Sequence, residues 1–554
     1  MGGRHFYNPN FNVRCTMNKK LLSVSIISAF TLAFATGCTT QEKTAPVVSV
    51  AEQATPAISE IDRSYLLSSD RLTEVDGNTI NVASEEQVAA LKAQFENLKD
   101  GDEVVIPNGK YANLGQVTIT ANDITVKAEQ AGSVWLTGLV QFELKGDDIT
   151  LDGLVFTEGG PNERFGGVRM MGDNNTLQNS TFYYFNHAYE YQPDERRSEY
   201  PRYLWVSLWG KDGKVINNRF EGKQKRGTLI GVQKDDSADN HLIANNIFMD
   251  QKPNQFNEFD IKEAIRYNGN SWEALRIGDS KSSQWDSNSK FVNNLMIDMD
   301  GERELVSVKS GGNKISGNTI FESSALISLR HGKGSSVENN IILGNKKNLT
   351  GGIRIYDEDH VIRNNYIANT RGRDGVIEGN ADLRGGIVIN TGIIDVANGE
   401  ELDQSVKGKE LNKQWTPKNI TIENNSLVDT QWGIIYGNQT HRVSLFNNAE
   451  VEKIYAGVDI AFNNNVVDNS ESPEFVSVRA TEDYPLVNAT YDNETYVGQV
   501  TASEQISSYS VELPAMTVTN GINAYQGEGA DVSKLAVVTA ETAGPDYVLE
   551  NTTK

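Results

Sequence analysis

Cysteine is almost absent from this 554-residue chain, which contains only Cys15 and Cys38. Both lie near the N-terminus, so a disulfide framework cannot hold the rest of the chain together. Basic residues are also outnumbered, with 51 Lys and Arg against 74 Asp and Glu and a formal net charge of −23. Such an acidic chain is unsuited to nucleic acid or to an anionic membrane surface as a partner.

Long apolar runs are scarce too, and the clearest one lies within residues 17–38. Lys19 and Lys20 precede it and small residues ending at Cys38 follow, which is typical of a secretory signal. The Ala-Thr-Gly-Cys ending resembles the lipobox of bacterial lipoproteins, in which the cysteine is acylated; an ordinary cleaved signal is the alternative. We therefore expect residues 1–37 to be a signal peptide of the lipoprotein type, with translation starting at Met1 or Met17.

This signal leads to expectations about location and domain boundaries. Residues 38–61 are rich in Thr, Ala, Pro and Glu and are expected to form a linker. Residues 62–554 are expected to form a single domain with a C-terminal extension. Thr39, rather than Asp, follows Cys38, which favours sorting to the outer membrane of a Gram-negative bacterium. We expect a protein exported to the periplasm or cell surface, where a lipid on Cys38 is its membrane contact, or one that is secreted.

An asparagine motif recurs through the chain, as VNNL at 292–295, GNTI at 317–320, ENNI at 338–341 and RNNY at 363–366. Its period of 22 to 25 residues indicates a repeat fold. Each repeat contains short β-branched or aromatic runs broken by Gly, Asn and Asp, without a helical pattern. The sequence therefore predicts an all-β solenoid, the right-handed parallel β-helix, which needs no larger core as it lengthens.

The paired asparagines have a structural explanation. Stacked side-chain amides can hydrogen-bond along the axis of a solenoid, and Asn tolerates the left-handed conformation needed at its corners. Before the repeats, Ser84 to Gln87 is typical of a capping box, and Val88, Leu91, Phe95 and Leu98 form an apolar stripe. A short helix there would cover the open N-terminal end of the solenoid.

Five charged residues fall at spacings that a solenoid would bring together. Arg330 follows Lys309 by 21 residues and Arg354 follows Arg330 by 24. Stacking one turn apart would make these three a column of cations, with Glu302 and Glu304 beside its base. Taken singly, each of these residues is typical of a solvated surface, and only their common spacing suggests a site.

At these residues the sequence resembles polysaccharide lyase family six, the family of alginate lyases and chondroitinase B. The similarity runs through four strings in order, NGNSWEALRIGDS (268–280), DGERELVSVKS (300–310), ISLRHG (327–332) and GGIRIYDEDH (351–360). It implies a parallel β-helix that cleaves a uronate-containing polysaccharide by calcium-assisted β-elimination, and we expect that polysaccharide to be alginate.

The resemblance also implies a role for individual residues. Lys309 would be the Brønsted base and Arg330 the acid, Asn270, Glu302 and Glu304 would bind Ca²⁺, and His331 and Arg354 would bind substrate. Two short departures from the family pattern, Val-Lys-Ser around Lys309 and Glu-Ala-Leu-Arg at 273–276, remove none of these groups. Asn268 is an alternative to Asn270, because both lie in one short segment.

These residue types suit the chemistry. The C5 proton of a uronate is hardly acidic while the adjacent carboxylate keeps its charge, so a cation must neutralise that carboxylate. Carboxylate oxygens such as those of Glu302 and Glu304, expected on one face of a strand, are ligands that Ca²⁺ prefers. Lys309 must act as a neutral amine, which nearby positive charge favours. Arg330 would stabilise negative charge on the leaving oxygen, with either Arg330 or water supplying the proton.

Other functions stay open at this point. The family's animal-glycosaminoglycan branch acts on dermatan sulfate, and this activity is the runner-up to alginate cleavage. A β-helix hydrolase would need a cluster of aspartates, and no comparable cluster stands out. A glycan-binding surface lipoprotein without catalysis would use the same fold. Preference for mannuronate or guluronate, endo or exo action and oligomeric state depend on loops that the repeat pattern does not define.

Overall fold

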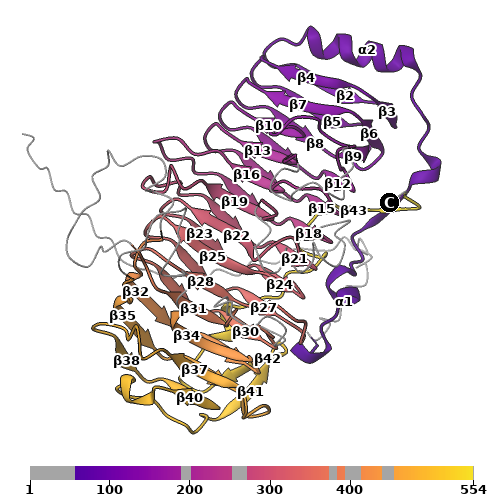
Figure 1. Ribbon diagram of the computed structural model, residues 1–554. Coiled ribbons are helices and arrows are strands. Elements are labelled where there is room, and N and C mark those ends of the chain that lie inside the picture. The colour runs from indigo at the N-terminus through magenta and orange to yellow at the C-terminus, as the bar shows by residue number, and fades with distance from the viewer. Residues whose placement is uncertain are drawn as a thin grey trace, which may run out of the picture. The chain divides into compact units, whose positions relative to one another are not determined.

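The computed structural model describes residues 56–188, 201–252, 271–372, 384–393, 414–438 and 454–552. Within these ranges the chain winds into three long parallel sheets of thirteen strands each, and successive turns contribute one strand to every sheet (Figure 1). This arrangement is a right-handed parallel β-helix. The predicted fold class is therefore confirmed.

The three sheets share one pattern, in which every third strand pairs with its predecessor. Sheet 1 contains β4 (Gly115–Ile119), β7 (Val140–Leu144), β10 (Val168–Met170), β13 (Val206–Leu208), β16 (Ile230–Val232), β19 (Leu275–Gly278), β22 (Glu304–Lys309), β25 (Leu326–His331), β28 (Ile353–Ile355), β31 (Ile387–Asn390), β34 (Trp432–Asn438), β37 (Val476–Ala480) and β40 (Gln499–Thr501). Sheet 2 contains β2 (Glu103–Ile106), β5 (Thr125–Ala128), β8 (Thr150–Asp152), β11 (Thr176–Gln178), β14 (Lys214–Ile216), β17 (Leu242–Ala244), β20 (Lys290–Val292), β23 (Lys314–Ser316), β26 (Ser336–Glu338), β29 (Val361–Arg363), β32 (Lys418–Glu423), β35 (Val458–Asn463) and β38 (Thr490–Asp492). Sheet 3 contains β3 (Gly109–Ala112), β6 (Val134–Gly138), β9 (Leu154–Gly159), β12 (Thr181–Tyr183), β15 (Arg219–Glu221), β18 (Ile247–Met249), β21 (Leu295–Ile297), β24 (Thr319–Phe321), β27 (Ile341–Leu343), β30 (Tyr366–Ala368), β33 (Ser426–Val428), β36 (Val466–Asp468) and β39 (Thr495–Val497).

The recurring asparagines occupy the corner between sheets 2 and 3, where each member of a pair has its own role. The first member takes a left-handed conformation, as at Asn293 (φ 55°) and Asn339 (φ 57°), and Gly317 (φ 68°) takes the same conformation in the GNTI repeat. The second member is buried and donates from its side-chain amide to the carbonyl oxygen of the next, as from Asn294 to Asn318 at 3.0 Å. Both predicted roles of the asparagines are confirmed.

This asparagine ladder runs along most of the solenoid axis. Its amide-to-amide distances are 2.9–3.0 Å, and its members are Asn218, Asn246, Asn294, Asn318, Asn340, Asn365, Asn425 and Asn465. Glu494 ends the ladder by accepting from Asn465 at 2.9 Å. Each turn is thereby held in register with the next.

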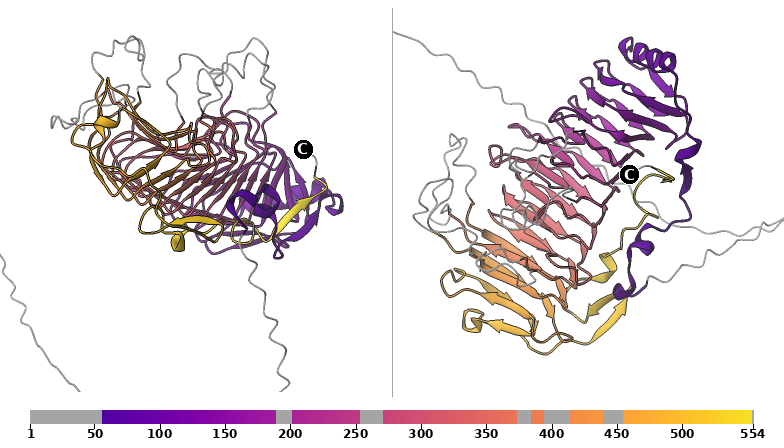
Figure 2. Two further views of the ribbon diagram at one scale, coloured as in Figure 1. Left: turned by 90° about the horizontal axis from the view of Figure 1, so that it is seen from below. Right: turned by 45° about the vertical axis from the view of Figure 1, so that its right-hand side comes forward.

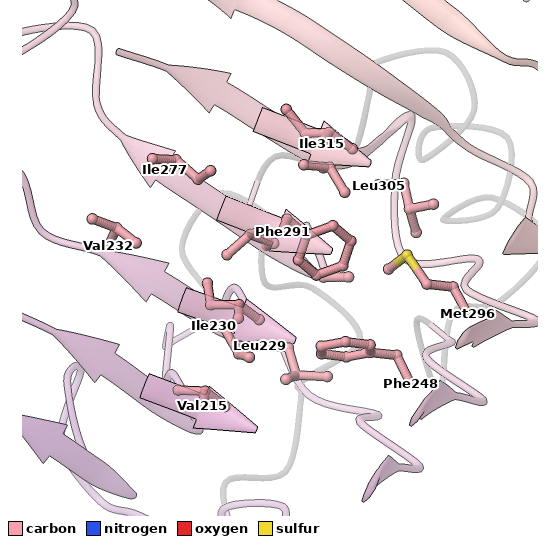
Figure 3. Packing of buried hydrophobic residues seen from close by; sticks show 14 of the residues in the cluster. Val215, Leu229, Ile230, Val232, Phe248, Ile277, Phe291, Met296, Leu305 and Ile315 are labelled. Carbon is pink, nitrogen blue, oxygen red and sulfur yellow. The ribbon is translucent and has the colours of Figure 1, made fainter. Parts of the chain in front are cut away.

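Alternate residues of every strand point into the space between the sheets, and this interior is apolar (Figure 3). Phenylalanines stack in consecutive turns, with ring centroids 4.3 Å apart for Phe156 and Phe182, 5.2 Å for Phe182 and Phe220, and 5.1 Å for Phe220 and Phe248. Like side chains thus stack on like side chains, which fixes strand register because a slip would turn the apolar set outward.

Helix α2 (Glu85–Glu96) covers the N-terminal end of the solenoid (Figure 1). Ser84 and Gln87 form the expected capping box, and Leu91 and Phe95 are buried against the first turns. The Phe95 ring lies edge-on to that of Phe142, with centroids 5.8 Å apart. The predicted capping helix is therefore confirmed.

After β40 the chain turns back along the outside of sheet 3 (Figure 2). It forms a hairpin of β41 (Met516–Thr519) and β42 (Ile522–Tyr525), the short helix η6 (Val532–Lys534), and finally β43 (Tyr547–Glu550). β43 pairs with β1 (Thr73–Asp76), which follows helix α1 (Arg63–Leu67). We call residues 526–550 the C-terminal strap.

Among the described residues, no helix combines the length and the apolar character that crossing a membrane requires. The predicted signal peptide, Cys38 and most of the predicted linker lie outside the described residues.

Candidate functional site

The outer face of sheet 1 carries most of the residues that the sequence singled out. In β22 the side chains of Val306 and Val308 enter the core, so Ser307 and Lys309 point outward. The same alternation in β28 buries Ile353 and Ile355 in the core and leaves Arg354 on the outer face. The period of two thus places Lys309 and Arg354 on one surface.

Strand register differs from the simple column of cations that the spacing predicts. Lys309 pairs with His331, and a register shift between Val308 and Lys309 leaves Arg330 as the extra residue of a β-bulge. Arg354 pairs with Ser328 instead of Arg330. The column prediction is therefore wrong in detail, because one inserted residue re-aims the side chains of β25.

Glu304 is the point on which the cations converge. Its Oε1 contacts Nη2 of Arg354 and lies 3.6 Å from Nε of Arg330, while its Oε2 accepts a hydrogen bond from Ser307 and lies 4.0 Å from Nζ of Lys309. Burial alone would raise the pKa of Glu304, but Arg354, Lys309 and Arg330 outweigh it and hold the pKa well below its usual range. Glu304 is therefore a carboxylate at any ordinary pH.

Glu302 lies just before β22, so it does not share a strand face with Glu304 as expected. It still reaches the same site, since its Oε1 accepts from the backbone N–H of Trp272 at 3.0 Å. Burial raises the pKa of Glu302 well above its usual range, and the neighbouring charges of Glu273 and Glu304 raise it further. Burial and two neighbouring carboxylates thus both disfavour the charged form of Glu302.

Glu273 is a further member of the site that sequence reasoning missed. It is 2% exposed, accepts from Thr228 Oγ1 at 2.8 Å and has its Oε1 3.8 Å from Nζ of Lys309. Its signal in the sequence was weak, because it lies 36 residues before Lys309 and only the pairing of β19 with β22 brings the two together.

His331 is buried beside Lys309, with 1% of its surface exposed. Neither ring nitrogen has a hydrogen-bond partner among the described residues. Burial lowers the pKa of His331 well below its usual range, and Arg330 and Lys309 lower it further, so the imidazole is neutral. A neutral ring with two unused nitrogens is suited to receive a polar group of a ligand.

Tyr356, also missed by sequence reasoning, positions both guanidinium groups. Its ring centre lies 5.5 Å from Cζ of Arg330 and 5.6 Å from Cζ of Arg354. Such cation–π contacts stabilise an arginine by roughly 0.5–2 kcal/mol. Arg330, His331 and Arg354 are thus placed around Lys309 and Glu304, as the sequence led us to expect, although their roles stay predictions.

The structure describes only some of the expected calcium ligands. Asn270 and its alternative Asn268 lie outside the described residues. In the part of the chain that the structure describes, no group of three or more His, Cys, Asp or Glu is arranged to hold a metal ion. Glu302 and Glu304 nevertheless offer hard carboxylate oxygens of the kind that Ca²⁺ binds. Both oxygens of Glu304 already contact Ser307 or a cation of the site, so a Ca²⁺ ion there would need Glu302 and a further ligand.

Comparison with known proteins identifies the class to which this fold and site belong. The sequence model of the Chondroitinase B family matches residues 84–512. The chain therefore belongs to the Chondroitinase B family, that is, to polysaccharide lyase family six, which also contains alginate lyases. The family resemblance predicted from four short strings is confirmed.

Two solved structures are closely similar to the chain, each with 89% identity, a TM-score of 0.86, and coverage of 90% of this chain and 100% of that chain. One is described as a new PL6 alginate lyase in complex with a trisaccharide, and the other as the alginate lyase AlyF-OU02 in complex with G6. The PL6 alginate lyase AlyGC, at 22% identity and a TM-score of 0.63, covers 86% of this chain over 58% of its own length and shares the fold. No curated protein matches the chain.

Proposed function

We propose that this chain is an alginate lyase that cleaves its substrate by β-elimination and leaves a 4,5-unsaturated uronate at the new non-reducing end. The observation that carries the proposal is the convergence of Lys309, Arg330 and Arg354 on Glu304 at the outer face of sheet 1. Two solved structures with 89% identity, both described as alginate lyases, support the choice of substrate.

Binding would place the carboxylate of one uronate residue against the guanidinium groups of Arg330 and Arg354. Their positive charge reduces the negative charge beside C5, which makes the C5 proton easier to remove. Both guanidinium groups are held by Glu304 and Tyr356 before substrate arrives. The site therefore needs little reorganisation on binding.

Lys309 would then take the C5 proton. Oxygens of Glu273 and Glu304 lie 3.8 and 4.0 Å from its Nζ and hold the amine in place. The electron pair of the broken C5–H bond forms the C4–C5 double bond as the bond from C4 to the glycosidic oxygen breaks. Arg330 stabilises the charge on that leaving oxygen, which receives its proton from Arg330 or from water.

We propose Ca²⁺ as an aid to this reaction, held by Glu302 and Glu304, with Asn270 as the predicted further ligand. When bound, the ion would supply additional positive charge for neutralising the substrate carboxylate. Removal of metal by a chelator should then abolish activity, and added Ca²⁺ should restore it. Full activity in excess chelator would mean that the arginines neutralise the uronate without calcium.

The structure changes which variant tests calcium best. Glu304→Ala would leave the buried Arg354 without its carboxylate, so its inactivity would not distinguish a lost metal from a disturbed arginine. Glu302→Gln removes the carboxylate that Ca²⁺ would bind and keeps an acceptor for the Trp272 N–H. If calcium assists, Glu302→Gln should need a higher Ca²⁺ concentration for half-maximal activity; an unchanged requirement would argue against Glu302 as a ligand.

The proposed activity is tested by incubating the purified protein with alginate, polymannuronate and polyguluronate and following the ultraviolet absorbance of unsaturated products. Sizing those products would reveal the preferred uronate and endo or exo action. Dermatan sulfate belongs in the same assay, because the family that matches residues 84–512 carries the name Chondroitinase B. Cleavage of dermatan sulfate alone would overturn the choice of alginate.

Export and lipid anchoring form a separate part of the proposal, since Cys38 lies outside the described residues. A lipid on Cys38 would keep the enzyme at the membrane. In a Gram-negative host, Cys38→Ser should move the protein from the membrane fraction to the soluble fraction. An unchanged distribution between the fractions would exclude the anchor.

A further inference from the structure

We propose that Arg164, Arg202 and Arg276, together with the ring pair of Phe165 and Trp209, form a distal binding site for uronate residues of the substrate several sugars from the cleaved bond. This inference rests on the proposed alginate lyase activity. It goes beyond that activity by assigning to a second part of the sheet 1 surface the binding of longer substrates.

The distal site lies on the same sheet face as Lys309, toward the N-terminal end of the solenoid (Figure 1). Ser207, Gly231, Arg276 and Ser307 occupy equivalent positions in the consecutive strands β13, β16, β19 and β22. At ~4.8 Å between neighbouring strands, β13 lies roughly 14 Å from β22, which is the length of several sugar rings. Ser207, Gly231 and Ser307 are themselves buried, and the Leu204 side chain lies against Gly231, so a bound chain would contact the side chains that rise above this row.

The ring pair stands directly over the far end of that row. Trp209 donates from its indole N–H to Ser207 Oγ at 3.1 Å, and Ser207 donates to the carbonyl oxygen of Phe165 at 3.3 Å. The two rings meet edge to face with centroids 4.9 Å apart. Trp209 is only part-buried, so it presents apolar ring surface on which a sugar ring can rest.

The arginines supply the charge that a uronate needs. Cζ of Arg164 lies 5.0 Å from the centre of the Phe165 ring. Burial lowers the pKa of Arg164, the positive charges of Arg202 and Arg276 lower it further, and Asp279 raises it. Among the described residues none of the three forms an ion pair, and Arg202 donates to Ser271 Oγ at 3.3 Å. Nε of the part-buried Arg276 has no hydrogen-bond partner there, as is also true of Nε of Arg169. Three like charges gathered without a paired carboxylate favour an anionic ligand.

The neighbouring Arg169 shows what a structural arginine looks like on this face. It pairs with Ser207 in register, and its Nη1 lies 3.1 Å from Glu143 and 3.7 Å from Glu163. Its charge is therefore already compensated within the protein. Arg169 provides a matched control for the three arginines of the distal site.

The opposite direction along sheet 1 is closed to a charged chain. Val388 and Ile435 follow Arg354 in the next two strands and point outward, yet they are 0% and 1% exposed and pack with Trp432. On the other side of Lys309, the neighbouring strand β19 carries Arg276 on the outer face of sheet 1, so the charged residues of the distal site lie in that direction.

The test compares Arg164→Ala with Arg169→Ala on alginate and on a length series of alginate oligosaccharides. Loss of a charge-assisted contact should raise KM of Arg164→Ala about tenfold on alginate and make that KM less sensitive to salt, with kcat nearly unchanged. The effect should fade as the oligosaccharides become too short to reach from Lys309 to Arg164. Arg169→Ala should leave KM within about twofold of wild type.

Trp209→Ala gives an independent readout, because it should shift the length distribution of the products while thermal unfolding shows that the variant is folded. An equal rise in KM on the shortest and longest substrates, or no rise in Arg164→Ala at all, would overturn the distal site. Wild-type protein that cleaves no uronate polymer would instead overturn the proposed function. The two failures are therefore distinguishable.

Discussion

Glu304 connects the charged side chains of the site into one network, since Arg354, Arg330, Lys309 and Ser307 all lie within reach of its two oxygens. A buried carboxylate of this kind contributes little net stability, because desolvation opposes the attraction between the charges. Its effect is geometric, in that it fixes three flexible side chains at one place. Each residue in the network is therefore best changed singly, with the fold checked in parallel.

Lys309→Ala should reduce the rate of elimination by about a thousandfold, because a positioned base contributes that order of rate enhancement. The side chain lies at the surface of sheet 1 and outside the apolar core, so thermal unfolding should change little. Initial rates on alginate, measured by absorbance, check the first expectation. Activity within tenfold of wild type would remove Lys309 from the role of base.

Arg330 and Arg354 should differ in kinetics. Arg330→Lys should lower kcat by roughly a hundredfold, since lysine lacks the planar fork that stabilises charge in the transition state. Arg354→Ala should mainly raise KM and should also lower the unfolding temperature, because Glu304 loses a partner in the protein. The reverse pattern, with Arg354 controlling kcat and Arg330 only KM, would place the scissile bond one strand further along.

Much of this site was predictable from the chain, but its details depend on pairing between distant segments. Lys309, Arg330 and Arg354 could be found because the repeat period brings them together. The bulge at Arg330 adds a single residue that no composition signal marks, and it replaces Arg330 by His331 opposite Lys309. Glu273 and Tyr356 were not predicted, because their roles arise from contacts across strands.

At the scale of elements, the two asparagines of one pair offer a matched comparison. Asn294→Ala should destabilise the protein by about 3 kcal/mol, because it leaves buried partners on three sides, including Asn246 and Asn318, without hydrogen bonds. Asn293→Gly should cost at most about 1 kcal/mol, since Gly317 fills the equivalent left-handed position in the next turn. Chemical denaturation of both variants measures the difference, and equal losses would contradict a ladder role for Asn294.

Glu494 makes the C-terminal end of the ladder sensitive to pH. Burial raises the pKa of Glu494 to about 7, although Tyr496 and Asn465 donate hydrogen bonds to it. The folded protein therefore binds a proton that the unfolded chain releases near pH 4.5. The stabilisation is fully present below that value and is lost as pH rises through about 7.

Glu494→Gln removes this titration while keeping an acceptor for Asn465. The variant should unfold at a higher temperature than wild type at pH 8 and at nearly the same temperature at pH 5. Glu471→Gln, at an exposed position, should behave like wild type at both pH values. A constant difference between Glu494→Gln and wild type across this range would exclude the titration.

The repeating elements were more predictable than the ends of the chain. The Asn motif and the alternating apolar residues define the turns, and Ser84 with Gln87 defines the capping helix. The return of the C-terminal strap to β1 carries no such signal, because β1 and β43 are separated by more than 450 residues and neither repeats a motif. Their pairing follows from apolar surface on sheet 3 that only the folded solenoid presents.

At the scale of the whole molecule, the strap lies on sheet 3 and the site on sheet 1, so stability and activity should separate. The strap covers buried residues of β18, β21, β27 and β30, and Arg71 donates to the strap carbonyls of Ala540 and Gly544. Leu535, 4% exposed, is one of its anchors. Leu535→Ala should destabilise the protein by about 2 kcal/mol, at the low end for a buried leucine.

Lys534→Ala is the matched control for this variant, because Lys534 is adjacent to Leu535, largely exposed and paired with Asp531, the residue that caps η6. It should change the free energy of unfolding by less than about 0.5 kcal/mol. At temperatures where both variants are folded, kcat and KM on alginate should equal those of wild type. A loss of activity in folded Leu535→Ala would mean that the strap also influences sheet 1, through the shared core between the sheets.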